Sequence, residues 1–164
     1  MHQEEELVDI LNNWLIKYKF TARVEGASNW GWGWCKETDE IALCFCEDPD
    51  IDAMWESFIY NYIGCKIKCH TFFSSFLHEL GHSETWEFIP EEEIDVFGRY
   101  KSPFEYFTLP REIAATRWAI NFMETQSIAL AELIEITTPI IIELDEMASI
   151  HKLTNDLTIY SFTN

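Results

Sequence analysis

The spacing of apolar residues divides most of the chain into expected helices. Apolar positions recur every three or four residues at 4–19, at 48–64 and at 72–82, which predicts three amphipathic helices. A further helix is expected at 108–123, and another at 127–136. Because proline is tolerated only in the first turn, we expect Pro139 to start a separate helix that runs to about residue 150.

Alternation of apolar and small or polar residues predicts short strands in the first third of the chain. These strands are expected at 20–24, 30–35 and 41–46, with a turn at 26–29 and a polar loop at 36–40. A small antiparallel sheet of about three strands follows from this order. The alternating Trp and Gly residues of 30–34 have two interpretations. They form a cap on a small core, or a surface that a backbone or ligand approaches closely.

Two segments have no clear period. Residues 83–107 carry two prolines, an acidic run and several aromatic residues, and a long irregular segment of this kind often forms a rim or lid over a site. Residues 153–160 are not assigned to a helix or a strand. The whole chain has 164 residues, of which 48% are hydrophobic, and this is enough for one domain with a substantial core.

Charge narrows the classes of partner. The formal net charge is −18, which repels a phosphate backbone, so direct nucleic-acid binding is not expected. An acidic surface favours a basic protein or peptide, although acidity also serves solubility alone. No membrane span is expected, because the apolar stretch 128–142 is interrupted by Glu132, Glu135 and Pro139.

Cysteine usage and the N-terminal composition predict a cytoplasmic protein. The first six residues are acidic where a secretory leader is basic, and five cysteines are an odd number for a disulfide framework. The spacings Cys44-x-Cys46 and Cys65-x3-Cys69-His70 differ from those of standard structural zinc sites. We therefore expect reduced thiols and no second metal site.

The expected helix at 72–82 contains His78-Glu79-Leu80-Gly81-His82, a His-Glu-x-x-His motif. On a helix, His78 and His82 lie one turn apart on one face, where two imidazoles reach the same metal ion. Glu79 lies beside them, where it can act on a water bound to the metal. The alternative is an ordinary amphipathic helix whose polar face carries two histidines. An apolar stripe would face the core: Phe72, Phe73, Phe76, Leu77 and Leu80.

A catalytic zinc site takes a third protein ligand and keeps one position open. The metzincin pattern would place a histidine at the position of Phe88, so that variant is absent. Glu112 lies in the first turn of an expected helix, where the helix dipole favours a carboxylate. The small residues Ala115, Thr116 and Ala119 would let that helix pack closely on another. From these residues alone, Glu112 is either a metal ligand or an exposed first-turn glutamate.

The motif helix, together with residues 110–115 (Pro-Arg-Glu-Ile-Ala-Ala) and Trp118-Ala119, resembles the ImmA/IrrE-type zinc metallopeptidases of the gluzincin group. That family has His-Glu-x-x-His on one helix and Glu-x-x-Ala on the next. The resemblance covers about residues 5–125 and implies an α+β, zincin-like fold that is mainly helical. It also implies that Glu112 is the third ligand of one Zn²⁺. Residues 127–164 are expected as a C-terminal helical extension of the same single domain.

The resemblance implies an endopeptidase that hydrolyses a specific cytoplasmic protein, such as a regulator. Glu79 would be the general base, and the oxyanion would need a further donor. Tyr106, Tyr100 and His70 are the candidates for that donor, and each has a purely structural alternative. A substrate strand is expected to add to the sheet edge near 30–34 or 41–46.

The alternative function is that of a binding protein that keeps the zincin-like scaffold but does not catalyse a reaction. Such a protein would use its acidic surface to mimic nucleic acid or to sequester a basic partner, as some counter-defence proteins of phages and mobile elements do. The net charge favours this alternative. Glu79 favours catalysis, because a scaffold that only holds zinc needs no general base.

Overall fold

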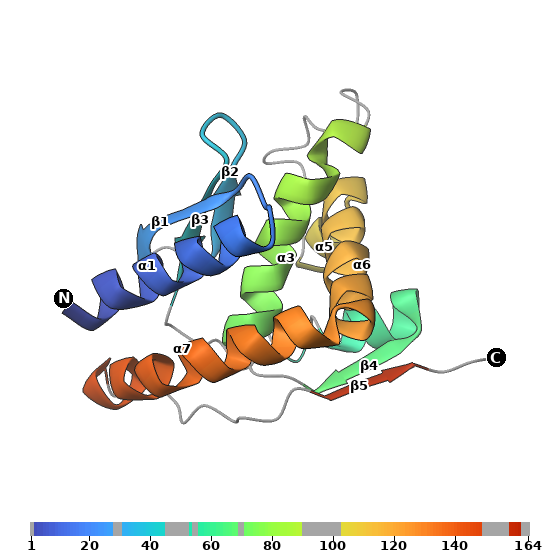
Figure 1. Cartoon of the computed structure of the whole chain (residues 1–164). Helices are drawn as coiled ribbons and strands as arrows, with labels where there is room; N and C mark the ends of the chain where they lie inside the picture. Colours follow the sequence, from blue (N-terminus) through green and yellow to red (C-terminus); the bar gives the residue numbers. More distant parts are fainter. Residues whose placement is uncertain are drawn as a thin grey trace.

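The computed structural model describes residues 2–27, 31–44, 53, 56–68, 71–89, 103–148 and 158–161. These residues are mostly helical. The long helices are α1 (His2–Lys17), α3 (Thr71–Thr85), α6 (Pro110–Thr125) and α7 (Ser127–Ala148). In Figure 1, α3 and α6 pack side by side through the centre, α1 and the main sheet lie on the other side of α3, and α7 runs beneath them.

The main sheet consists of β1 (Arg23–Ala27), β2 (Gly33–Cys35) and β3 (Glu40–Leu43). The central strand is β3, which pairs antiparallel with β2 and parallel with β1. The prediction of an antiparallel sheet is therefore wrong, and the sheet is mixed. The prediction fails because the alternation of side chains specifies only which face of the sheet each side chain occupies. The same alternation fits a parallel or an antiparallel strand.

An α1 side chain fixes β1 at the edge of this sheet. Asn12 donates an Nδ2–H to the Val24 carbonyl at 2.9 Å, and its Oδ1 accepts the Val24 N–H at 2.8 Å. This pair of bonds satisfies a stretch of strand backbone that would otherwise form an open edge. The strand expected at 20–24 is observed at 23–27, and the strand expected at 30–35 is observed at 33–35. The strand expected at 41–46 is observed at 40–43. Residues 45–46 lie outside the described part of the chain.

The core forms where α1 meets the sheet, α3, α6 and α7. Trp14 is its largest fully buried side chain, and its indole N–H donates to the Ala129 carbonyl at 3.0 Å. The Trp14 ring contacts Phe20, Phe76 and Phe122 with centroids 5.6 to 6.2 Å apart. At the surface, Lys17 pairs with Glu132 at 2.6 Å. Residues 127–148, expected as an extension, thus pack directly on α1.

The interior of α7 differs from its prediction, because one helix runs through Pro139 where two were expected. An interior proline costs about 3 kcal/mol or more, since it removes one backbone hydrogen bond. Buried apolar residues lie on both sides of it, namely Leu133 before and Ile140, Ile141 and Leu144 after. Burial of each such side chain contributes about 1.5–3 kcal/mol, which offsets the local cost and keeps the helix continuous.

Several short elements were not expected. β4 (Cys65–Lys68) pairs antiparallel with β5 (Thr158–Ser161), although the sequence pattern predicts no strand in either segment. The segment 83–107 contains the end of α3, the 3-10 helix η2 (Trp86–Phe88) and α5 (Pro103–Phe107). Residues 90–102 of it lie outside the described chain.

The helix expected at 48–64 is described at residue 53 and from residue 56 onward. Residues 56–58 are helical and continue into the π-helix η1 (Ile59–Ile63). Gly64 ends the segment with φ of 81°, as predicted for a glycine after a helix. Across the described residues, no helix combines the length and apolar character needed to cross a bilayer.

Candidate metal centre

The site exists because α3 and α6 approach each other very closely. A Cβ atom added to Gly81 would lie 2.4 Å from the carbonyl oxygen of Ala115 and 3.0 Å from its carbonyl carbon and Cα. Ala115, Thr116 and Ala119 are almost fully buried at this contact. The small face of α6 therefore packs against α3, and only glycine fits at position 81 without displacement of a backbone.

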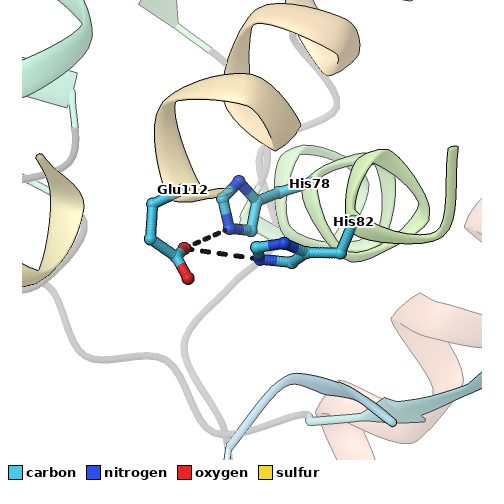
Figure 2. Close-up of side chains that lie close together, drawn as sticks. All are labelled: His78, His82 and Glu112. Atoms are coloured by element: carbon cyan, nitrogen blue, oxygen red, sulfur yellow. Dashed lines mark hydrogen bonds and ion pairs between the residues drawn. The ribbon is translucent and has the colours of Figure 1, made fainter. Parts of the chain in front are cut away.

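Three side chains from these helices converge on one point. His78 and His82 extend from α3, and Glu112 extends toward them from the first turn of α6 (Figure 2). Glu112 Oε2 lies 2.9 Å from His78 Nε2 and 3.4 Å from His82 Nε2. One ligand atom from each residue falls within 4.8 Å of the other two. This group can hold a metal ion, and it is the only such group among the residues described.

Burial separates the three ligand atoms from bulk water. His78, His82 and Glu112 are 9%, 7% and 2% exposed. A buried carboxylate with no partner would be strongly destabilising, so Glu112 requires a compensating charge. His78 Nε2 and His82 Nε2 approach one oxygen of this carboxylate, and Arg111 contributes a positive guanidinium whose Nε lies 3.4 Å from Glu112 Oε1. The carboxylate thus directs one oxygen to the histidines and the other to Arg111.

The pKa values of this group follow from the same contacts. Burial raises the pKa of Glu112, but its interactions with His78 and His82 outweigh burial and hold that pKa well below the ordinary value. Burial lowers the pKa of His78, and the hydrogen bond and charge of Glu112 outweigh it, so the pKa is raised. The Glu112 carboxylate therefore favours the protonated form of His78, so a proton and a metal ion would compete for this nitrogen.

The second nitrogen of His78 is also fixed. His78 Nδ1 lies 3.1 Å from the hydroxyl oxygen of Thr116, which is almost fully buried. When Nδ1–H donates to this hydroxyl, the lone pair of Nε2 is left for a metal. Sequence reasoning treated Thr116 only as a small residue. The signal that could have found it is its position, one turn after Glu112 on the same face of α6.

His82 is oriented differently, by aromatic contact. The ring of Trp34 on β2 stacks on the His82 ring with centroids 6.2 Å apart and an interplanar angle of 13°. Trp34 also contacts Trp86 at 5.2 Å, whereas Trp32 packs on Phe72 at 5.2 Å. Both Trp32 and Trp34 pack against the core, as expected for a cap, and Trp34 also contacts His82. The expected close approach at the glycines is not observed within the described residues, because a Cβ atom added to Gly31 or Gly33 would meet no atom within 4 Å.

Glu79 lies in the same buried environment without belonging to the ligand group. Burial raises its pKa, the charges of His78 and His82 lower it, and the charge of Glu112 raises it, with a net increase. A carboxyl group whose pKa moves toward neutrality is better matched to proton transfer than an exposed one. The site therefore contains a carboxyl group suited to acid–base chemistry beside a potential metal position.

Of the three residues considered as oxyanion donors, Tyr106 is described. It lies on α5, half-buried, and its ring centroid is 6.0 Å from the Arg111 guanidinium carbon. Burial raises the pKa of Tyr106, and the charges of Glu112 and Glu79 together with a hydrogen bond to Glu112 raise it further. The phenol thus stays protonated and remains a hydrogen-bond donor. Tyr100 and His70 lie outside the described residues.

Comparisons with protein-family models, with curated proteins and with solved structures found no match to this chain. The functional argument therefore depends on the geometry and chemistry of the site itself.

Proposed function

We propose that this protein is a zinc-dependent endopeptidase with a zincin-like fold, similar to the ImmA/IrrE-type metallopeptidases. One observation carries the proposal. Two imidazole nitrogens and one carboxylate oxygen, from two closely packed helices, converge within 4.8 Å beside a carboxyl group that is not a ligand. Zinc binds this combination of nitrogen and oxygen ligands, and three protein ligands leave a coordination position open.

The donor set fits zinc at each residue. His78 and His82 present Nε2 toward the shared point, and Glu112 presents one carboxylate oxygen. When bound, Zn²⁺ would supply Lewis-acid activation of a water molecule and of a scissile carbonyl. Thr116 would hold His78 in the tautomer that frees Nε2, and Arg111 would engage the other oxygen of Glu112.

Glu79 would carry the proton. It would accept a proton from the attacking water and deliver that proton to the leaving amine. Its burial next to the ligand group and its raised pKa support this assignment. Tyr106 would donate a hydrogen bond to the developing oxyanion, because its phenol stays protonated and lies beside Glu112.

The substrate we propose is a specific cytoplasmic protein, such as a regulator, cleaved at or near a basic segment. The net charge of −18 supports a basic partner, since opposite charge accelerates encounter. The same charge supports a second candidate function, in which the protein binds a basic partner or mimics nucleic acid without cleaving anything. Glu79 favours the peptidase over the binding function, because a protein that only binds a partner needs no general base.

Metal analysis combined with Glu79→Gln tests the proposal. The purified wild type is expected to contain one zinc per chain, and Glu79→Gln is expected to keep it while losing cleavage. The control is Glu84→Gln, which changes another carboxyl of α3 outside the ligand group and should keep both properties. Cleavage is measured with a quenched fluorescent peptide library and by comparison of new protein N-termini in cells that express each variant.

Two results would refute the peptidase proposal. The first is a wild-type protein that binds no zinc when the metal is supplied. The second is a Glu79→Gln variant that cleaves as efficiently as the wild type. Stable capture of an uncut basic partner by both proteins, with no cleavage by either, would favour the binding function instead.

A further inference from the structure

Asp39 joins three separate segments of the chain next to the candidate metal centre. Its Oδ1 accepts the indole N–H of Trp34 at 2.8 Å and the hydroxyl of Ser83 at 2.7 Å. Its Oδ2 accepts the hydroxyl of Thr21 at 2.8 Å, and its backbone carbonyl accepts the Arg23 N–H at 3.0 Å. The residue thus ties the turn between β2 and β3 to α3 and to the segment before β1.

Asp39 adopts a backbone conformation that is uncommon for residues with a side chain. Its φ is +54°, in the left-handed region that L-residues rarely adopt. Glycine meets this backbone requirement at lower cost than any residue with a side chain. An aspartate there retains a conformational cost, and the three hydrogen bonds of its carboxylate are the contacts that offset it.

Two of those three bonds lead to His82. Trp34, which donates to Asp39, stacks on the His82 ring nearly in parallel, with an interplanar angle of 13°. Ser83, the second donor, follows His82 directly in α3. The Asp39 carboxylate therefore fixes both the ring that covers His82 and the backbone that carries it. The third bond, to exposed Thr21, leads away from the metal centre.

We propose that Asp39 is a positioning residue of the metal centre, which acts through Trp34 to set the ring plane of His82. Its role parallels that of Thr116, which fixes the ring of His78 by a direct hydrogen bond. The inference rests on the proposed metal binding, because a fixed imidazole plane matters most when Nε2 must point at an ion. Mutation of residues that orient a metal ligand commonly lowers metal affinity by about 10- to 100-fold.

Three substitutions separate this role from general stabilisation. Asp39→Gly keeps the left-handed backbone and removes all three side-chain bonds. Asp39→Asn keeps Oδ1 as an acceptor for Trp34 and Ser83, so this conservative variant is expected to keep the zinc affinity that Asp39→Gly loses. Thr21→Val is the matched control, because it removes only the bond that leads away from His82.

Zinc affinity is measured by competition with a chromophoric chelator, with urea unfolding of each metal-free variant in parallel. Asp39→Gly is expected to weaken zinc binding by about 10- to 100-fold, whereas Asp39→Asn and Thr21→Val stay within about threefold of the wild type. Wild-type affinity in Asp39→Gly would overturn the positioning role. So would a loss in Thr21→Val as large as that in Asp39→Gly.

A second measurement needs no metal. Stacking by Trp34 gives the His82 ring protons a ring-current shift in the NMR spectrum, assigned by its loss in His82→Asn and calibrated with Trp34→Leu. Asp39→Gly is expected to reduce this shift, and Thr21→Val is expected to keep it. If the wild type bound no zinc, the peptidase proposal would fail, yet this shift would still decide the role of Asp39. An unchanged shift in Asp39→Gly would overturn it.

Discussion

Replacement of Gly81 by alanine tests whether the proposed metal centre depends on the close packing of α3 and α6. The added Cβ would lie 2.4 Å from the Ala115 carbonyl oxygen, whereas ordinary contact begins at 3.4 Å. The two helices must therefore separate locally by about 1 Å along this direction. The atoms that obstruct the methyl group belong to the backbone, so no side-chain rotation relieves the contact.

Stability and metal affinity should respond differently to this substitution. Alanine favours an isolated helix over glycine by about 1 kcal/mol, whereas overpacking costs about 1–3 kcal/mol. The net free energy of unfolding should therefore fall by roughly 0–2 kcal/mol. Gly81 directly precedes His82, and Ala115 lies three residues after Glu112. A shift of 1 Å exceeds by several-fold the tolerance of a metal–ligand distance, about 0.2 Å, so zinc affinity should fall at least about tenfold.

The assay is chelator competition for zinc together with urea unfolding of the metal-free protein. Asn13→Ala, an exposed α1 site, is the control for a gain in helix propensity without a clash. Addition of Ala115→Gly to Gly81→Ala should not restore affinity, since the obstructing atoms are the carbonyl group and Cα of residue 115. If Gly81→Ala bound zinc like the wild type and unfolded at higher urea, the link between helix packing and the metal centre would be refuted.

Four further predictions concern the site and the core. Thr116→Val removes the partner of His78 Nδ1, so zinc affinity measured by calorimetry should fall about 10- to 100-fold, and unchanged affinity would contradict the tautomer assignment. The pKa of His78 is raised, and metal binding requires the neutral ring, so zinc affinity should increase as pH rises through that pKa. Calorimetry in buffers of different ionisation enthalpy should show the release of a proton on binding. An affinity independent of pH from 6 to 8 would argue against the pairing of His78 with Glu112. Tyr106→Phe should lower kcat about 10²- to 10³-fold in a peptide-cleavage assay of zinc-saturated protein, and an unchanged kcat would exclude it as the oxyanion donor. Trp14→Phe loses the bond to the Ala129 carbonyl and some buried volume, so urea unfolding should show a loss of about 1–3 kcal/mol, whereas wild-type stability would contradict its central place in the core.

The sequence predicts those elements whose signal repeats locally. The amphipathic period places α1 and α3 within a few residues of their observed bounds, because each turn of those helices buries an apolar side chain. The motif in α3 identifies His78 and His82 by their spacing, and the first-turn position of Glu112 makes it a candidate. The convergence of the three residues requires the packing of α3 on α6, which no local pattern specifies.

The remaining features depend on contacts between segments far apart in the chain. Thr116 lies 38 residues from His78, and Asp39 lies 44 residues from Ser83, so no local pattern pairs the two members of either contact. The parallel pairing of β1 with β3 is hidden for another reason, since alternation is the same in both directions. The continuity of α7 through Pro139 reflects tertiary burial that overrides a local preference.

The contact of α1 with α7 has a consequence for synthesis of the chain. The indole N–H of Trp14 finds its carbonyl partner 115 residues later, at Ala129. At translation rates of about 5–20 residues per second, the face of α1 that α7 covers stays without this partner for roughly 6–23 s. During that interval Trp14 and its apolar neighbours on α1 are the surface on which a chaperone, or a second nascent chain, can act.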